Sequence, residues 1–253
     1  MHRMSCLIVA GWVAAGLFTP CAGADIIDFE GLANGQEIGR GSHGEAAQPY
    51  ADIFVLYGAS NGVTTQGAAI FDSDPLGPNA GGADRDLLVG LGNILIVQND
   101  SHATQTIPGF YDTPNDEADG GTIAFEFLSA VELLSLVLID IDGHGAVDVI
   151  LEDSGGYLRT YNVGGSWTHD IHSQGPIGWD TLDLTSLASQ VGEGGGMATA
   201  WQDPLFDSSD VMRLTVVLSG SAAIDNLVYN IPAPSALVAM VGGLLVPARR
   251  RRR

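Results

Sequence analysis

The stretches Gly121-Thr-Ile-Ala-Phe-Glu-Phe127 and Val131-Glu-Leu-Leu-Ser-Leu-Val-Leu-Ile-Asp-Ile141 decide the fold class, because they are rich in the β-branched and aromatic side chains that favour strands. Similar runs recur along the chain between Gly, Asp, Asn and Pro turn residues, and helical periodicity is almost absent. They cover residues 26–29, 53–57, 69–71, 93–98, 146–152, 157–163, 181–184, 211–218 and 222–229. About eleven strands without crossover helices predict an all-β chain, an antiparallel β-sandwich or jelly roll, with one helical turn at 187–191.

Residues 25–230 contain no internal repeat and no linker, so we expect one β-sandwich domain there. Asp142-Gly143-His144-Gly145 lies between two strong strand runs and predicts a tight hairpin turn, because glycine supplies positive φ angles. The run Gly192-Glu-Gly-Gly-Gly196 follows no strand run and predicts a flexible loop. Long loops are expected at 41–51, 73–84, 100–121 and 164–178, where a rigid sandwich usually carries its binding sites.

Residues 1–24 have the layout of a secretory signal peptide, which we expect to form a helix and to be removed on export. Arg3 supplies the positive end, residues 6–18 the apolar segment, and Ala22-Gly23-Ala24 the small-residue cleavage site. Cys21 does not indicate a lipoprotein, because the residues before it are not the small ones of a lipid-attachment site. Both cysteines fall in the removed segment, so the mature body needs a large core, a bound metal, or both, in place of disulfides.

The charge of the chain is unevenly distributed. Six of the ten basic residues lie at the two ends, whereas all 30 acidic residues lie between residues 25 and 230. Four arginines against 30 acids give this body a formal charge of −26. Such a field disfavours nucleic acid and anionic lipid as partners and favours bound cations. The hydrophobic content of 45% still indicates a folded domain and not an acidic disordered chain.

Residues 231–253 combine three segments of different chemistry. Pro232-Ala233-Pro234 cannot continue a strand, and residues 236–248 form an uncharged apolar run that predicts a short helix. This run is shorter than the roughly 18 residues of an ordinary membrane-spanning helix, so we expect a transient or marginal anchor. Five arginines then hold the end in the cytoplasm: Arg249, Arg250, Arg251, Arg252 and Arg253.

This ending resembles the PEP-CTERM sorting signal of exported proteins in Gram-negative bacteria, which has a Pro-x-Pro motif, a short hydrophobic helix and an arginine cluster in that order. Two positions depart from the pattern, since Ala233 stands where Glu is usual and Pro247 breaks the helix just before the arginines. The resemblance implies handling by an exosortase, a membrane transpeptidase that cuts near the Pro-x-Pro motif. The protein would then be anchored briefly in the inner membrane and delivered to the cell surface or extracellular matrix. The alternative is a plain C-terminal tail anchor.

The body carries a second resemblance. Asp28-Phe-Glu-Gly-Leu32 and Ile224-Asp-Asn-Leu-Val-Tyr229 resemble the terminal strands of galactose-binding-like jelly-roll domains. Phe71-Asp-Ser73, Asp84-Arg-Asp-Leu87 and the run from Gly121 to Phe127 are similar to phrases in exported PEP-CTERM bodies of that type. The resemblance implies a sandwich whose first and last strands lie side by side, often with a structural calcium ion near them.

Five carboxylates are the candidate calcium ligands, because Ca²⁺ takes six to eight hard oxygen atoms. Glu30 and Asp225 could contribute two if their strands pair. The loop acids Asp72, Asp84 and Asp86, with Asp74 beside them, could supply more. The alternative is that these acids are solvated and cap turns.

Other metal and catalytic patterns find little support. Asp140-x-Asp142-x-His144 begins like an EF-hand loop, but Leu151 stands at its twelfth position and both flanks predict strands. His169 and His172 would point to opposite faces of a strand, so no zinc site is predicted. The chain has no Gly-x-Ser-x-Gly elbow and no His-Glu-x-x-His motif, and nothing singles out two of its acids for glycoside hydrolysis.

The sequence therefore predicts a non-enzymatic, exported surface or matrix protein that binds polysaccharide, with exosortase and the secretion machinery as partners. Aromatic residues in or beside loops are the candidates for sugar contact, although aromatics more often fill a sandwich core: Trp167, Trp179, Trp201, Tyr111 and Tyr50. The alternative is a secreted carbohydrate-active hydrolase on the same fold, because fold does not decide function.

Overall fold

The computed structural model describes residues 23–41, 44–45, 48–64, 66–82, 84–141, 145–170 and 178–232. Within them the chain is all-β, as predicted, with fifteen strands and one short 3₁₀ turn, η1 (Asp100–His102). Residues 23–232 form one compact unit, and its described part has no helix long and apolar enough to cross a membrane. The predicted signal-peptide helix and C-terminal hydrophobic helix lie outside the described residues.

Strand β8 (Gly121–Ile139) belongs to two sheets at once. Its first half pairs with β5 (Phe54–Ser60) and β14 (Val211–Leu218), and its second half pairs with β11 (Trp179–Asp183) and β15 (Ala223–Asn230). The sequence predicts two strands here, but residues 128–130 stay extended and join them into one of 19 residues. No glycine or proline interrupts that stretch, so the backbone continues from one sheet into the next.

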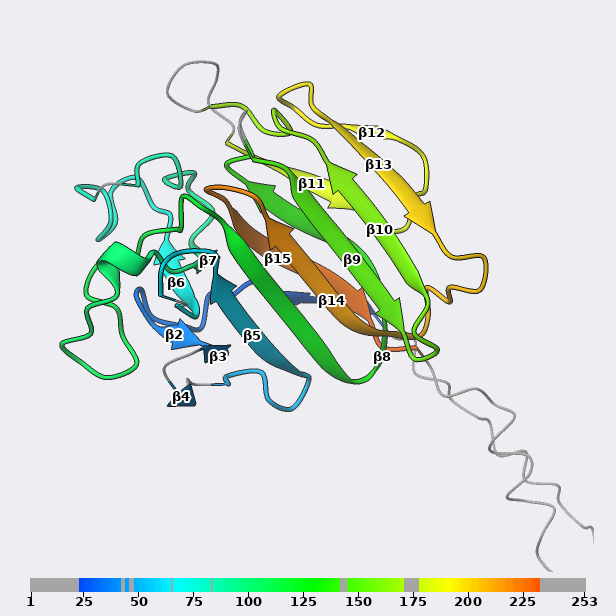
Figure 1. Ribbon diagram of the computed structural model, residues 1–253, viewed down its shortest axis with the longest axis horizontal. Coiled ribbons are helices and arrows are strands. Elements are labelled where there is room, and N and C mark those ends of the chain that lie inside the picture. The colour runs from blue at the N-terminus through cyan, green and yellow to red at the C-terminus, as the bar shows by residue number, and fades with distance from the viewer. Residues whose placement is uncertain are drawn as a thin grey trace, which may run out of the picture. The chain divides into compact units, whose positions relative to one another are not determined.

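The first sheet has the order β12–β13–β10–β9–β14–β8–β5, drawn as the front layer of Figure 1. Its pairs are antiparallel, apart from one parallel bridge between β3 and β5. Strand β13 was not predicted, because its sequence Met-Ala-Thr-Ala-Trp-Gln holds a single β-branched residue. The strands not yet given bounds are β3 (Arg40–Gly41), β4 (Gly44–Glu45), β9 (Val147–Asp153), β10 (Leu158–Val163), β12 (Gln190–Val191) and β13 (Met197–Gln202).

The second sheet has the order β11–β8–β15–β7–β6–β2, with β1 beside β15 (Figure 1). Strand β1 (Asp25–Ile27) pairs antiparallel with β15, which confirms the expectation that the first and last strands of the body are neighbours. The remaining strands are β2 (Glu37–Ile38), β6 (Ala68–Asp72) and β7 (Asn93–Val97). The two sheets have apolar residues between them, which gives a sandwich-like arrangement.

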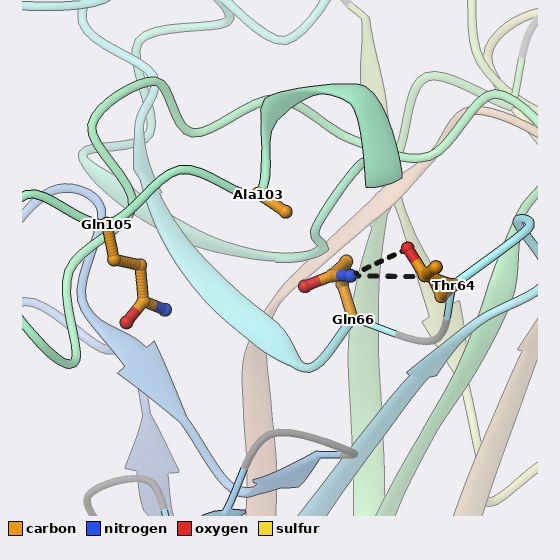
Figure 2. A pocket seen from close by; sticks show the side chains of 4 residues that line it. All are labelled: Thr64, Gln66, Ala103 and Gln105. Atoms are coloured by element: carbon orange, nitrogen blue, oxygen red, sulfur yellow. Dashed lines mark hydrogen bonds between the residues drawn. The ribbon is translucent and has the colours of Figure 1, made fainter.

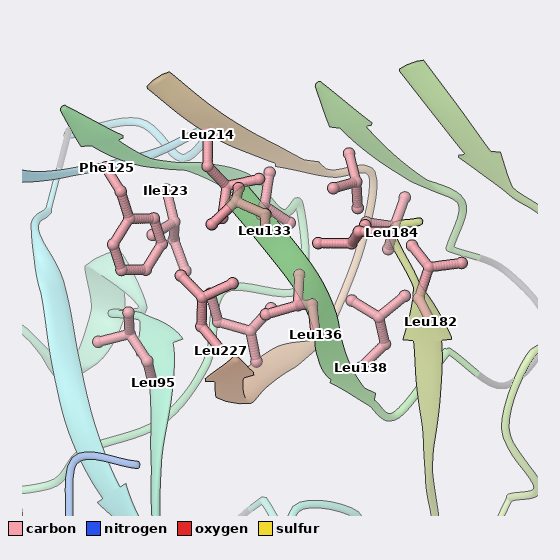
Figure 3. Packing of buried hydrophobic residues seen from close by; sticks show 14 of the residues in the cluster. Leu95, Ile123, Phe125, Leu133, Leu136, Leu138, Leu182, Leu184, Leu214 and Leu227 are labelled. Carbon is pink, nitrogen blue, oxygen red and sulfur yellow. The ribbon is translucent and has the colours of Figure 1, made fainter. Parts of the chain in front are cut away.

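The main core lies between the two sheets. Figure 3 shows Ile123 and Phe125 from the first half of β8 in the same apolar layer as Leu136 and Leu138 from its second half. A second apolar cluster covers the opposite face of the second sheet, and includes Phe71 and residues of the loops after β6 and η1. Strands β6 and β7 are therefore buried on both faces, which explains why they read as continuous apolar runs and not as alternating ones.

The predicted hairpin between β8 and β9 is not found. Strand β9 pairs with β10 and β14 in the first sheet, whereas the end of β8 pairs with β11 and β15 in the second. The chain around Gly145 therefore crosses from one sheet to the other, and residues 142–144 themselves lie outside the described part. The predicted helical turn at 187–191 is also absent, since Gln190 and Val191 form β12.

The glycine run at 192–196 forms a loop between β12 and β13, as predicted, and packs against Trp167, which is 1% exposed. The amide of Gly194 donates to the Trp167 carbonyl at 3.0 Å, and that of Gly196 to the Ser166 carbonyl at 2.6 Å. A Cβ added at Gly194 would lie 2.1 Å from the Thr168 carbonyl oxygen. The glycines are therefore required for close backbone approach, and their spacing along the sequence gives no local sign of it.

We expect Gly194→Ala to lower the free energy of unfolding by about 1–3 kcal/mol, because backbone atoms block the new Cβ. The matched control is Gly81→Ala, since a Cβ there meets nothing within 4 Å. Chemical denaturation of both variants measures the difference. Equal stability of the two variants would mean that the glycine run does not hold Trp167 in place.

Candidate functional site

The junction of the first and last strands brings Glu30 and Asp225 into one region. Phe29 and Asn226 both have positive φ angles, 58° and 48°. Phe29 lies directly before Glu30, and Asn226 lies where the register of β15 shifts directly after Asp225. Glu30 Oε1 accepts the Asn93 amide at 3.0 Å, and the Asn93 side chain donates to the Phe29 and Leu32 carbonyls at 3.2 and 2.8 Å. The start of β7 therefore fixes the turn that carries Glu30.

Asp225 is the buried carboxyl of this junction, with 1% of its surface exposed. Its Oδ2 accepts the Asn226 side-chain amide at 2.8 Å, whereas Oδ1 is buried without a hydrogen-bond partner. Burial raises the pKa of Asp225 to about 8, and the charges of Glu30 and Asp28 add to the rise against an opposing backbone hydrogen bond from Asn226. A buried oxygen without a partner is the kind of atom that a cation would satisfy.

The pKa of Tyr50 is affected by the same acidic region. Burial raises its pKa, and the charges of Asp28, Asp225 and Glu30 act in the same direction. The charges of three carboxylates therefore act on one half-buried phenol. Asp28 is held by a 3.3 Å hydrogen bond from the Glu30 amide to its Oδ1. We name Asp28, Glu30 and Asp225 the terminal-strand acids.

Asp72 lies near this junction, but its carboxylate accepts a backbone hydrogen bond within the turn that follows β6. It pairs with Asn93 across β6 and β7, and its Oδ1 accepts the Asp74 amide at 3.0 Å. Asp74 in turn caps the Leu76 amide at 2.8 Å. The contacts of Asp72 and Asp74 are therefore those of acids that cap turns, which the sequence analysis gave as the alternative to calcium ligands.

Asp84 and Asp86 lie in a second acidic cluster, together with Asp116 and Asp140. Asp84 Oδ2 accepts the Asp116 amide at 3.2 Å, and the Ser221 hydroxyl donates to the carboxylates of Asp116 and Asp140. A cavity of about 240 Å³ is lined by Asp86, Asp140 and the chain around Ser221. The structure thus divides the five predicted calcium ligands among two clusters and one turn.

Asp116 is the most perturbed acid of this second cluster. Burial raises its pKa well above the ordinary value, and a hydrogen bond with the Asp84 side chain and the charge of that group add to the rise. The side-chain hydrogen bond from Ser221 acts in the opposite direction. Sequence reasoning missed Asp116, because its partner Ser221 lies 105 residues away and no motif joins them.

Within the described ranges, no group of three or more His, Cys, Asp or Glu side chains could hold a metal ion. A cation at the terminal-strand acids would therefore need backbone carbonyls and water to complete its shell, as calcium commonly does. The all-oxygen donor set and the unpartnered Asp225 Oδ1 fit such an ion.

Of the five aromatic residues considered for sugar contact, Trp201 alone presents most of its side chain to solvent, at 56% exposure. Trp167 and Tyr111 are buried, Tyr50 stacks on Phe54 with ring centroids 5.3 Å apart, and Trp179 packs against the second apolar cluster. These four belong to the packing of the sandwich, as aromatics more often do.

Trp201 begins a row of side chains across six paired strands. The cross-strand register places these residues in line: Trp201, Thr160, Ile150, Thr215, Ala124 and Tyr57. A parallel row holds Thr199, Asn162, Asp148, Val217, Thr122 and Ala59, with Asn162 donating to Asp148 at 2.7 Å. Their neighbours along each strand point into the main core, so both rows lie on the outer face of the first sheet. We name it the Trp201 face.

No protein-family model and no curated protein matches this chain.

Proposed function

We propose that this chain is an exported, non-enzymatic protein that binds polysaccharide at the cell surface or in the extracellular matrix. In this proposal its body is a jelly roll of the galactose-binding-like type, supported by the pairing of β1 with β15 and by two sheets that share β8. Its ending is a PEP-CTERM-like signal that an exosortase processes after export and transient inner-membrane anchoring. The support is the order of the Pro-x-Pro motif, apolar run and arginines, which lie beyond the described residues except for Pro232.

The observation that carries polysaccharide binding is the Trp201 face. Its six-strand row spans about 24 Å at roughly 4.8 Å per strand, the length of several sugar units. Threonine hydroxyls and the Asn162 amide provide hydrogen bonds, and the exposed indole provides a flat apolar contact. The acidic body favours neutral glycans over polyanionic ones, because like charges repel.

We expect Trp201→Ala to weaken binding to a neutral polysaccharide about tenfold, which corresponds to about 1.4 kcal/mol. Affinity electrophoresis in gels containing galactomannan, a soluble glucan or alginate measures it, with retardation expected from a neutral polymer and not from alginate. Trp201→Phe should retain most of the binding. Ile26→Ala is the matched control, because Ile26 is 52% exposed on a strand of the other sheet. Equal retardation of Trp201→Ala and wild type would contradict the role of this face.

The hydrolase alternative has its own observation, the pKa of Asp116, which burial raises well above the ordinary value, since catalytic acids often have perturbed pKa values. A reducing-sugar assay on the same polysaccharides distinguishes the two functions. Release of sugar that is lost in Asp116→Asn would establish hydrolysis in place of binding alone.

We also propose structural calcium at the junction of the terminal strands, with Asp225 and Glu30 as the carboxylate ligands and backbone carbonyls and water completing its shell. Bound calcium would satisfy Asp225 Oδ1 and offset the repulsion among these acids. A cation that binds only the native state adds roughly 2.7 kcal/mol at a hundredfold excess over Kd.

The pKa of Asp225 gives this proposal a pH signature. Its pKa is about 8 in the folded state against 3.8 as the ordinary value, so the native state holds the extra proton between these pH values. In chelator, this group's contribution to stability is therefore present at low pH and is lost as pH rises from about 4 to about 8. Calcium competes with that proton, so its stabilising effect should be larger at pH 8 than at pH 5.

We expect Asp225→Asn to remove both the calcium-specific rise in Tm and part of the pH slope in chelator. Asp72→Asn is the control, because asparagine keeps the oxygen that caps the Asp74 amide. Thermal melts in calcium, in chelator, and in sodium chloride of matched ionic strength measure the effect. If sodium chloride reproduces the whole calcium effect, the terminal-strand acids do not form a calcium site.

Sorting is tested on the tail itself. Mass spectrometry of surface material is expected to find the body beginning at Asp25 and lacking Arg249 to Arg253. Replacing the five arginines by glutamine removes the stop-transfer charge and should impair retention and processing, whereas Arg213→Gln in the body should not. A surface protein that keeps its arginines would support the plain tail anchor.

A further inference from the structure

The chain contains two Asn-Gly steps, Asn34-Gly35 and Asn61-Gly62. An asparagine followed by glycine can lose its side-chain amide without an enzyme, because glycine has no Cβ to keep its backbone nitrogen away from the asparagine side chain. By sequence the two steps are alike. The structure places them in opposite environments, and this difference decides which of them is open to the reaction.

The reacting groups of Asn34-Gly35 are held in hydrogen bonds. The Gly35 nitrogen, which would be the nucleophile, is buried and donates to the Ile70 carbonyl at 2.8 Å. Asn34 Oδ1 accepts the Asp72 amide and the Asn79 side chain, both at 2.9 Å. Asn34 Nδ2 donates to Asn79 Oδ1 at 3.1 Å. Reaction at Asn34 therefore requires several bonds to be broken first.

Asn61-Gly62 lies in the connection between β5 and β6, where it is much less constrained. Asn61 is exposed, and Val63 just after the step is 100% exposed. The Gly62 nitrogen has no hydrogen-bond partner within the described ranges. The Asn61 side chain makes one hydrogen bond there, from Nδ2 to the Asp119 carbonyl at 3.2 Å. The attacking nitrogen is therefore available, and a single exposed bond holds the amide that it attacks.

The two ends of this connection are fixed. The Asn61 nitrogen donates to the Gly120 carbonyl at 2.9 Å, and the Thr64 nitrogen donates to Asp100 Oδ2. Figure 2 shows the far end, where Gln66 Nε2 donates to Thr64 Oγ1 at 3.1 Å. The Asn-Gly step thus begins a short exposed turn on an otherwise ordered part of the fold.

We propose that Asn61 is a site of spontaneous deamidation in the folded protein, whereas Asn34 is protected. The Gly62 nitrogen loses its proton to hydroxide and attacks Asn61 Cγ, which closes a five-membered succinimide ring. The Cγ–Nδ2 bond breaks, and Nδ2 takes a proton from water and leaves as ammonia. Water then opens the ring at Cγ to give aspartate, or at the main-chain carbonyl to give isoaspartate. This modification goes beyond the proposed function and does not depend on it.

The product places a new negative charge where carboxylates already lie. Gly62 packs against two of them, since a Cβ built on it would lie 2.3 Å from Asp100 Oδ2 and 2.8 Å from Glu117 Oε2. Deamidation also replaces the donor Nδ2 by an oxygen that cannot donate to the Asp119 carbonyl. Conversion of Asn61 therefore weakens the contact between this connection and the turn at Asp119.

The test is peptide mapping by mass spectrometry of the whole folded protein during incubation at mildly alkaline pH, with an isoaspartate-specific methyltransferase to mark that product. Deamidation at Asn61 is expected to be more than about tenfold faster than at Asn34, because hydrogen bonds must break before Asn34 reacts. In denaturant the two steps should react at similar rates, since the fold then protects neither.

Asn61→Gln is the blocking variant, because glutamine keeps the amide but would have to close a larger ring, which forms more slowly. It is expected to remove the product mapped to this position, and Asn34→Gln, the matched control, should leave that product unchanged. The inference is wrong if the two steps react at equal rates in the folded protein. It is also wrong if Asn61 stays intact while the denatured chain reacts, or if the methylation signal is unchanged in Asn61→Gln.

Discussion

The burial of β6 and β7 on both faces constrains the rest of this structure. The second apolar cluster must be covered, and the loops after β6 and η1 do so without strands of their own. Their polar atoms must then find partners next to an apolar sheet. Gln98, which is fully buried, meets this need by donating to the carbonyls of His102 and Thr113. Asn79 plays the same part by donating to Asn34 and to the Asp72 carbonyl.

The covering of the second sheet also explains where the buried carboxylates of the protein lie. The second acidic cluster and the terminal-strand acids both involve segments that border or cover the second sheet. Side chains there are removed from water by the covering loops, and each group left without a partner costs free energy. The Trp201 face differs, because it belongs to the outer side of the first sheet and Trp201 itself is 56% exposed to solvent.

Local sequence accounts for most of the strands and little of the sites. Runs such as 211–218 and 222–229 contain enough β-branched residues to place β14 and β15 within one residue of their bounds. The resemblance of the terminal strands correctly led to the β1–β15 pair and thus to Glu30 beside Asp225. Strand β13 was missed because tertiary pairing outweighs its weak propensity. The Asp84–Asp116 contact depends on loop packing between distant segments, which no local pattern encodes.

The pairing of β1 with β15 also has a mechanical consequence. Asp25 and Tyr229 are register partners, so the described chain enters and leaves the body at neighbouring positions. A body tethered through its C-terminal end would receive tension along β15, which is bonded to β8 on one side and to β1 and β7 on the other. Pulling along that axis loads these hydrogen bonds together in shear and does not peel them one by one. Resistance to such force is governed by the unfolding rate, so the terminal strand pair would set how long a tethered body withstands drag.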